Sequence, residues 1–238
     1  MNITSTTATV IDLSDRDLRQ RGLVPPEKLA MVHALVIGVG AIGRQVALQL
    51  AATGVQTMTL VDHDQVDVVN LAPQGYAPAD LGNKKVHATA ADCRRLNPEL
   101  TIDAKPERFG RASTKQLMCF EGKADRRLAI FCCVDSIATR GIIWHATSSR
   151  CGCFVDARMS AEVIRVLASA SPVNDVHYPS TLFESRQAHV GACTAKSTIY
   201  TASIAAGLML TQFSRWLRGI PLDRDLTLNL LSSELTVS

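Results

Sequence analysis

The sequence predicts an α/β fold, a mostly parallel sheet with helices on both faces and antiparallel strands toward the C-terminus. Short apolar runs alternate with segments whose apolar residues recur at helical spacing, which is typical of parallel strands joined by helices. A glycine-rich turn, Gly38-Val39-Gly40-Ala41-Ile42-Gly43, joins the first such run to the first helical segment. The 238 residues are 47% hydrophobic, enough for one large core, so we expect a single domain over 1–238.

The first half of the chain carries the strand–helix alternation. A strand at 34–37 enters the glycine turn, a helix follows at 42–52, and a second strand is expected at 57–61. The alternation then continues with a helix at 85–95, a strand near 100–104, a helix around 114–120, a strand at 128–134 and a helix at 137–148. This β-α-β order predicts parallel strands.

The second half has a different character. A strand at 153–156 is followed by a strand at 162–168 with little helical sequence around it, so we expect the sheet to change direction there. Residues 171–192 hold two prolines, few aliphatic residues and many polar ones, and predict a long, mobile crossover loop. A helix at 198–216 and a closing hairpin of 226–230 with 234–237 complete the prediction.

Composition argues against several classes of protein. The formal net charge is +3 with scattered basic residues, and aromatic residues make up 5%, so no nucleic-acid partner is expected. The first eight residues have neither a basic start nor an apolar run, which favours a cytoplasmic location. The longest apolar run, 199–213, is too short and too polar to span a bilayer, so no membrane partner is expected. The seven cysteines form no C-x-x-C pair, so we expect reduced thiols and no zinc site.

The glycine turn predicts a phosphate site. Gly38, Gly40 and Gly43 allow a tight turn, a close approach of backbone to phosphate, and tight helix packing. The free N–H groups of the helix N-terminus, around Ala41 and Ile42, would face the anion. This is a Rossmann-like arrangement, and it alone leaves open a dehydrogenase in which Asp62 binds a ribose hydroxyl.

Downstream motifs narrow this choice. Asp62-x-Asp64-x-Val66 is followed by Asn70-Leu71 and by Lys85, and Asp135-Ser136 follows a later strand. With Arg16-Asp17-Leu18-Arg19-Gln20 upstream of the glycine turn, the pattern resembles the ThiF/MoeB family, adenylyltransferases related to ubiquitin-activating enzymes. The resemblance extends over 16–219, nearly the whole chain.

The resemblance implies a set of roles. ATP would bind over the glycine turn, with Asp62 on its ribose, Asp64 in the same site, and Asn70 and Lys85 on its phosphates. Asp135 would hold the bridging Mg²⁺, and Arg19 would reach into the site of a neighbouring subunit, so the family implies a homodimer. The substrate would be the C-terminal glycine carboxylate of a ubiquitin-like or sulfur-carrier protein. Cationic and N–H donors fit this chemistry because the attack of a carboxylate on an α-phosphate brings anions together.

One residue departs from the family pattern. Pro73 stands where the family has arginine, which removes one expected phosphate contact, and Arg44 or Lys84 could replace it. A charged hydrogen bond is worth about 1.5–3 kcal/mol, so its loss would weaken activity without abolishing it. A non-catalytic copy that binds a ubiquitin-like partner, and an NAD-dependent oxidoreductase, are the alternative functions.

Individual residues also have plainer interpretations. Cys193, before the late helix, could form a thioester or simply pack in the core. Asp135 could cap the following helix, Lys85 could be a solvated helix residue, and Arg19 an ordinary surface charge.

Overall fold

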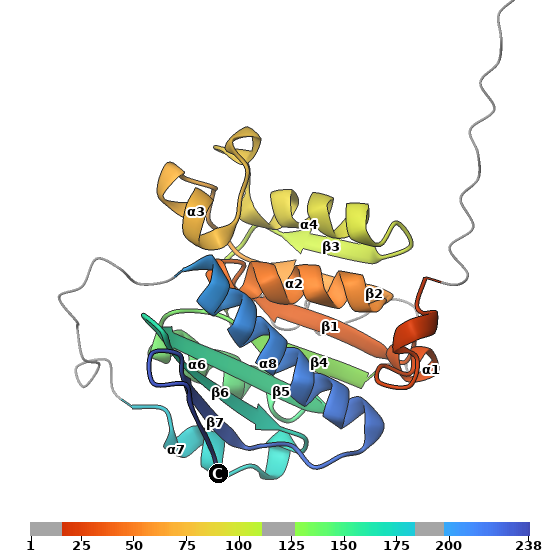
Figure 1. Cartoon of the computed structure of the whole chain (residues 1–238), viewed down its shortest axis with the longest axis vertical. Helices are drawn as coiled ribbons and strands as arrows, with labels where there is room; N and C mark the ends of the chain where they lie inside the picture. The colour runs from red at the N-terminus through yellow and green to blue at the C-terminus, as the bar shows by residue number, and fades with distance from the viewer. Residues whose placement is uncertain (1–15, 111–126, 184–197) are drawn as a thin grey trace, which may run out of the picture.

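The structure, a computed structural model, describes residues 16–110, 127–183 and 198–238. Within these residues eight strands form one sheet. They are β1 (Val32–Ile37), β2 (Thr57–Val61), β3 (Thr101–Lys105), β4 (Arg127–Cys132), β5 (Cys153–Ser160), β6 (Val163–Ser169), β7 (Asp225–Asn229) and β8 (Glu234–Val237). Their spatial order is β3-β2-β1-β4-β5-β6-β7-β8 (Figure 1).

The sheet is parallel over its first five strands and antiparallel after them. β1 pairs in parallel with both β2 and β4, and the parallel pairing extends to β3 on one side and β5 on the other. β6, β7 and β8 each run antiparallel to the strand before them. The reversal begins at the tight β5–β6 turn, where Ser160 pairs with Val163 and Ala161 takes a positive φ of 51°. This confirms the predicted mostly parallel sheet with antiparallel strands toward the C-terminus.

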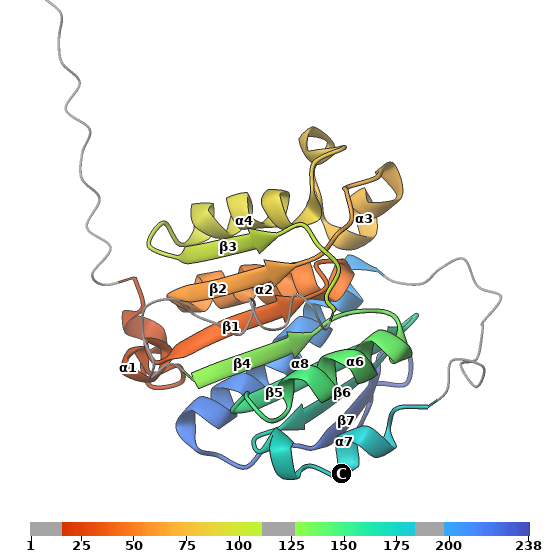
Figure 2. The same ribbon diagram turned by 180° about the vertical axis from the view of Figure 1, so that it is seen from behind.

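Helices cover both faces of the sheet, as the sequence predicts. The long helices α2 (Ala41–Thr53), α4 (Lys85–Leu96) and α8 (Ile199–Arg218) cover one face (Figure 1). The helices α6 (Ile137–Thr147) and α7 (His177–Ser180) lie on the other (Figure 2). The shorter helical pieces are η1 (Leu18–Gln20), α1 (Pro26–Leu29), η2 (Val68–Asn70), α3 (Leu71–Gln74), η3 (Pro78–Asp80) and η4 (Pro172–Asn174).

Each face has its own apolar core. On the α2/α8 face Phe131 packs edge-on against Phe213 of α8, with ring centroids 5.4 Å apart. On the opposite face Trp144 of α6 lies against Phe154 and Tyr178, at 4.9 and 4.5 Å. In the described part of the chain, even the 20-residue α8 lacks the combination of length and apolar character that crossing a bilayer requires.

The predicted crossover loop at 171–192 is wrong over its first part. Residues 172–174 form η4 and residues 177–180 form α7, whose Tyr178 is only 2% exposed. The aromatic contacts of Tyr178 anchor this segment to the sheet, which the polar local sequence does not reveal. The remainder of that loop and the helix predicted at 114–120 lie outside the described residues.

Candidate functional site

The predicted site residues come from the carboxyl ends of three neighbouring strands. β2 lies on one side of β1 and β4 on the other, so the chain passes from β1 to strands on both sides of it. In an open α/β sheet, ligands bind at the edge where the strand order reverses in this way. Gly38 follows β1, Asp62 follows β2, and Asp135 follows β4 by three residues.

The glycine turn packs directly on the end of β4. Gly38 has a φ of +87°, and a Cβ added to it would lie 2.8 Å from the carbonyl oxygen of Cys133. A Cβ on Gly43 would lie 1.8 Å from the carbonyl oxygen of Gly38, whereas one on Gly40 would meet nothing within 4 Å. Gly38 and Gly43 are therefore needed for packing, and the space at Gly40 is open to a ligand.

The N-terminus of α2 presents free backbone donors at this open space. Gly40 is the N-cap of α2, and no side chain within the described ranges caps that helix end. The first-turn N–H groups, from Ala41, Ile42 and Gly43, have no carbonyl partner within the helix and carry its positive dipole end. This geometry suits a phosphate group.

Asp62 is bound to the glycine turn. Its Oδ2 accepts from the backbone N–H of Val39 at 2.7 Å, and its Oδ1 accepts from the N–H of Asp64 at 2.9 Å. The carboxylate is 10% exposed. Asp62 therefore helps to fix the conformation of the glycine turn.

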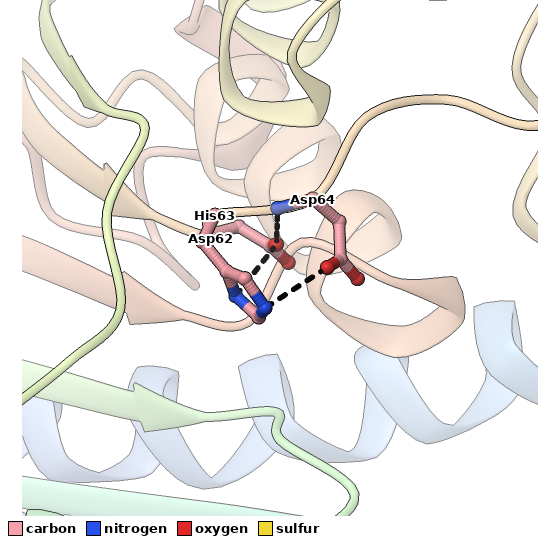
Figure 3. A group of neighbouring side chains, drawn as sticks. All are labelled: Asp62, His63 and Asp64. Atoms are coloured by element: carbon pink, nitrogen blue, oxygen red, sulfur yellow. Dashed lines mark hydrogen bonds and ion pairs between the residues drawn. The ribbon is translucent and has the colours of Figure 1, made fainter.

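Both carboxylate oxygens of Asp64 have a nitrogen partner. Lys85 Nζ is 3.1 Å from its Oδ2. His63 Nε2 is 3.1 Å from its Oδ1 (Figure 3). Partial burial favours a higher pKa, but the hydrogen bond and charge of Lys85, with His63 and Arg108, outweigh it and lower the pKa of Asp64. Asp64 is thus an anion at neutral pH.

Lys85 is buried, with 7% of its side chain exposed, so the interpretation of Lys85 as a solvated helix residue is wrong. It is the first residue of α4, and Asp64 is its ion-pair partner. Asp62, His63 and Asp64 form the one group among the described residues with metal-ligand geometry. Because the Lys85 ammonium already binds Asp64, this group is better matched to an ion pair than to a metal.

Asn70 and Asp135 lie in the segments that follow β2 and β4. Asn70 Oδ1 accepts from the N–H of Asp67 at 3.0 Å in a capping box, which orients its amide. Asp135 is exposed, and the cap of α6 is Ser136, whose Oγ accepts from Thr139 N–H at 3.3 Å. The capping interpretation of Asp135 is therefore wrong, and its carboxylate faces solvent next to the glycine turn's contact with Cys133.

The loop that carries Asp135 is held by a buried charged network. Arg140, 4% exposed, donates to the carbonyls of Val134 and Ala157 and is paired with the fully buried Asp156. Asp156 also accepts from Arg158 Nε at 3.0 Å. The sequence pattern does not indicate this network, because the pairing of Arg140 with Asp156 joins residues from separate elements.

Arg44, one of the two residues that could replace the missing family arginine, has protein partners in this structure. It is 5% exposed, donates to the Gly75 carbonyl at 2.8 Å and to Asp92 at 2.6 Å, and lies 4.4 Å from the ring centre of Tyr76. Lys84 donates to the His63 carbonyl at 2.9 Å. Arg44 and Tyr76 are residues whose structural importance the sequence alone did not indicate.

One predicted site residue, Arg19, lies away from the glycine turn of its own chain. Arg19 is exposed in η1, a segment tied to the other end of α2, where Gln20 donates to the Thr53 carbonyl. The 13-residue α2 is about 20 Å long, so Arg19 and the glycine turn of one chain lie at opposite ends. Cys193 lies outside the described residues.

We next compared the sequence with models of known protein families. The model of the ThiF family matches residues 15–236. The chain belongs to the ThiF family. This confirms the resemblance that the motifs indicated, and the match covers most of the chain.

Relatives within the ThiF family align over parts of their length. An adenylyltransferase and sulfurtransferase MOCS3 from Oryza sativa is 41% identical over 37% of this chain and 19% of its own length. A ThiS adenylyltransferase from Escherichia coli is 31% identical over 48% and 43%, and a SUMO-activating enzyme subunit 1 from Xenopus laevis is 32% identical over 42% and 29%. The matched region is thus less than half of each of these relatives.

Solved structures agree in fold. A crystal structure of PaaA has a TM-score of 0.75 at 20% identity and covers 99% of this chain and 86% of that one. Escherichia coli MccB determined with ATP has a TM-score of 0.68 at 14% identity, over 94% and 71%. The ThiF-type architecture therefore extends through the whole described sheet.

Proposed function

We propose that this protein uses ATP to adenylate the C-terminal carboxylate of a ubiquitin-like or sulfur-carrier protein. A carboxylate oxygen would attack the α-phosphorus, the bond from that phosphorus to the bridging oxygen would break, and pyrophosphate would leave. The observation that carries this is the convergence of open helix N–H donors, Asp62 and the Asp64–Lys85 pair at one edge of the sheet. Relatives named as adenylyltransferases and activating enzymes support it.

The charges suit an anionic reaction. The first turn of α2 has no side-chain cap, and Lys85 supplies a buried cation beside it, so developing charge on the phosphates would meet donors already in place. Lys85 could exchange Asp64 for a phosphate oxygen when nucleotide binds. Asp62 would hold the ribose while keeping its hydrogen bond to Val39.

Asp135 fits a magnesium ion. Mg²⁺ in nucleotide sites is held by one or two carboxylates together with phosphate oxygens and water, and Asp135 is an exposed carboxylate beside the turn. When bound, Mg²⁺ would offset phosphate charge during the displacement. The chain's own part is to hold Asp135 in place through Arg140.

A homodimer and a thioester at Cys193 belong to the same proposal. Arg19 lies too far from the glycine turn of its own chain, so it could serve only the site of a second copy. A non-catalytic binding role is the second candidate, favoured by Pro73 and by the engagement of Arg44 with Gly75 and Asp92. Membership of the ThiF family favours nucleotide activation over the oxidoreductase alternative.

Pyrophosphate exchange separates the two candidates. The purified chain is incubated with ATP, Mg²⁺, labelled pyrophosphate and the small Gly-Gly-ended protein encoded nearest to it. Exchange that depends on the carrier and is lost in Asp135→Ala supports adenylation. Carrier binding with equal, background exchange in wild type and Asp135→Ala would instead support the non-catalytic role.

A further inference from the structure

Both backbone polar groups of Val39, in the glycine turn, form hydrogen bonds with side chains. Its N–H donates to Asp62 Oδ2 at 2.7 Å, and its carbonyl oxygen accepts from the Tyr76 hydroxyl at 2.8 Å. Tyr76 follows α3 and is 4% exposed. Two segments distant in sequence therefore fix the two peptide units on either side of the Val39 Cα.

The Tyr76 hydrogen bond sets the direction of the Gly40 N–H, because the Val39 carbonyl and the Gly40 N–H belong to the same peptide unit. In a trans peptide unit the C=O and the following N–H point in opposite directions, and the described chain has no cis bond. Because the Val39 carbonyl points at the buried Tyr76, the Gly40 N–H points away from it. Gly40 is the N-cap of α2, and the space at its Cα is open, so this N–H faces the region where a ligand would lie.

Tyr76 is itself fixed in place. The guanidinium of Arg44 lies over its ring at 4.4 Å, and the hydroxyl of Thr89 lies 3.1 Å from its hydroxyl. The one hydrogen of Tyr76 goes to Val39, so Thr89 acts as donor to the Tyr76 oxygen. Burial raises the pKa of Tyr76, so the hydroxyl stays protonated and able to donate at physiological pH.

We propose that Tyr76 is a positioning residue for nucleotide binding, whose hydroxyl holds the Val39 peptide so that the Gly40 N–H is presented to a phosphate of ATP. That the ligand is ATP rests on the proposed function, whereas the role of Tyr76 in fixing the glycine turn does not. Tyr76 touches no reacting atom; it acts through Val39 and Gly40.

The test compares Tyr76→Phe with Thr89→Val. The first variant removes both hydrogen bonds of the hydroxyl, the one to the Val39 carbonyl and the one with Thr89. The second removes only the bond with Thr89, at a side chain that is fully buried, and leaves the Val39 bond intact. Both are measured for melting temperature without ligand, for the Kd of ATP with Mg²⁺ by calorimetry, and for the amide resonance of Gly40 by NMR.

We expect Tyr76→Phe, which loses both hydrogen bonds of the hydroxyl, to lose more melting temperature than Thr89→Val, which loses one. Tyr76→Phe should weaken ATP binding roughly three- to tenfold and shift the Gly40 resonance. Thr89→Val should do neither. ATP affinity that falls in both variants in proportion to the melting temperature, or that is unchanged in Tyr76→Phe, would overturn the proposal, since a merely structural role predicts that pattern.

Failure of the proposed adenylation can be distinguished from failure of the proposal about Tyr76. A wild-type chain that binds ATP but exchanges no pyrophosphate refutes adenylation and leaves the Kd comparison valid. If wild type binds no ATP, the Gly40 resonance decides: a shift in Tyr76→Phe alone supports the loop geometry, and no shift overturns it.

Discussion

Lys85 is the residue whose environment differs most from what its sequence position suggests. It opens α4, where a lysine is normally solvated, yet its side chain is 7% exposed and ends 3.1 Å from Asp64. Burying a cation is unfavourable unless an anion pairs with it. Asp64 itself is 48% exposed, so only the lysine of this pair is buried. In the proposed function, a phosphate oxygen would replace Asp64 as the partner of this ammonium.

Lys85→Met tests this role. The variant keeps the apolar stem and removes the charge, and Asp64 stays half solvated, so stability should change little. Loss of a charged hydrogen bond in the transition state predicts about a 10- to 150-fold drop in pyrophosphate exchange. Lys84→Met, which loses only a bond to the His63 carbonyl, is the matched control and should fall by less than about threefold. Equal losses in the two variants would contradict a specific role for Lys85.

Residue types were easier to predict than their partners. Gly38, Asp62 and Asp64 could be identified because a fixed short spacing after a strand end determines where they lie. The roles of Arg44 and Asp135 could not, since each depends on a contact from another segment: Gly75 and Asp92 engage Arg44, and Ser136 takes the cap that Asp135 could have supplied.

At the scale of elements, the close packing of α2 on the glycine turn determines the shape of the candidate site. Gly43→Ala would place a Cβ 1.8 Å from the Gly38 carbonyl oxygen, and only backbone movement can relieve this clash. We expect about 1–3 kcal/mol of destabilisation and at least a tenfold loss of ATP affinity. Urea unfolding and calorimetry measure the two effects.

Gly207→Ala is the control for that substitution. Gly207 lies inside α8, and the nearest atom to an added Cβ is 4.0 Å away. Alanine is the better helix former, so this variant should gain roughly 0.5–1 kcal/mol with unchanged ATP affinity. A stable Gly43→Ala protein with normal ATP binding would show that the turn tolerates a side chain.

The junction of β6, β7 and α7 predicts a pH dependence. Asp225 accepts two hydrogen bonds from Arg165, at 2.8 and 2.6 Å, and lies 3.1 Å from His177. Bonding to Arg165, opposed by burial and helped by His177, lowers the pKa of Asp225. A lowered folded-state pKa gives stability that is present above the unfolded value of about 3.9 and is lost as pH falls through the folded value.

Asp225→Asn measures that contribution. Because Arg165 is partly exposed, we expect ionised Asp225 to contribute about 1 kcal/mol to the free energy of unfolding near pH 6. This contribution should shrink toward zero as the pH drops below about 4. Urea unfolding of both proteins between pH 3 and 7 gives the difference. Asp103→Asn, which removes an exposed pair with Lys105, should be nearly neutral throughout. A difference that stays constant from pH 7 to pH 3 would refute the assignment to Asp225 ionisation.

The elements themselves were predicted well where local patterning decides them. β2 has the predicted bounds, and the direction change falls at the predicted strand, because apolar runs and glycines mark these features locally. α7 was missed because Tyr178 is buried by Trp144 and Phe154, two residues from other elements. Long-range aromatic packing overrides a polar local sequence in this segment.

At the scale of the whole molecule, the sheet order brings Gly38, Asp62 and Asp135 to one edge and leaves Arg19 at the other. η1 is fixed there, because Arg16 donates to the Ala51 and Ala52 carbonyls and Gln20 to that of Thr53. These bonds tie η1 to the C-terminal end of α2, about 20 Å from the glycine turn. Any role for Arg19 in catalysis must therefore come from a second copy of the chain.

Subunit complementation tests this arrangement. Arg19→Ala and Asp135→Ala should each be nearly inactive in pyrophosphate exchange as homodimers. In a heterodimer of the two, the Arg19→Ala chain keeps an intact nucleotide site and receives Arg19 from the Asp135→Ala chain, so one of the two sites is complete. Unfolding and refolding an equimolar mixture should restore about a quarter of wild-type exchange, because half of the dimers are mixed and each has one working site. If Arg19 instead acted within its own chain, or had no role, the mixture would show only the average of the two separate variants.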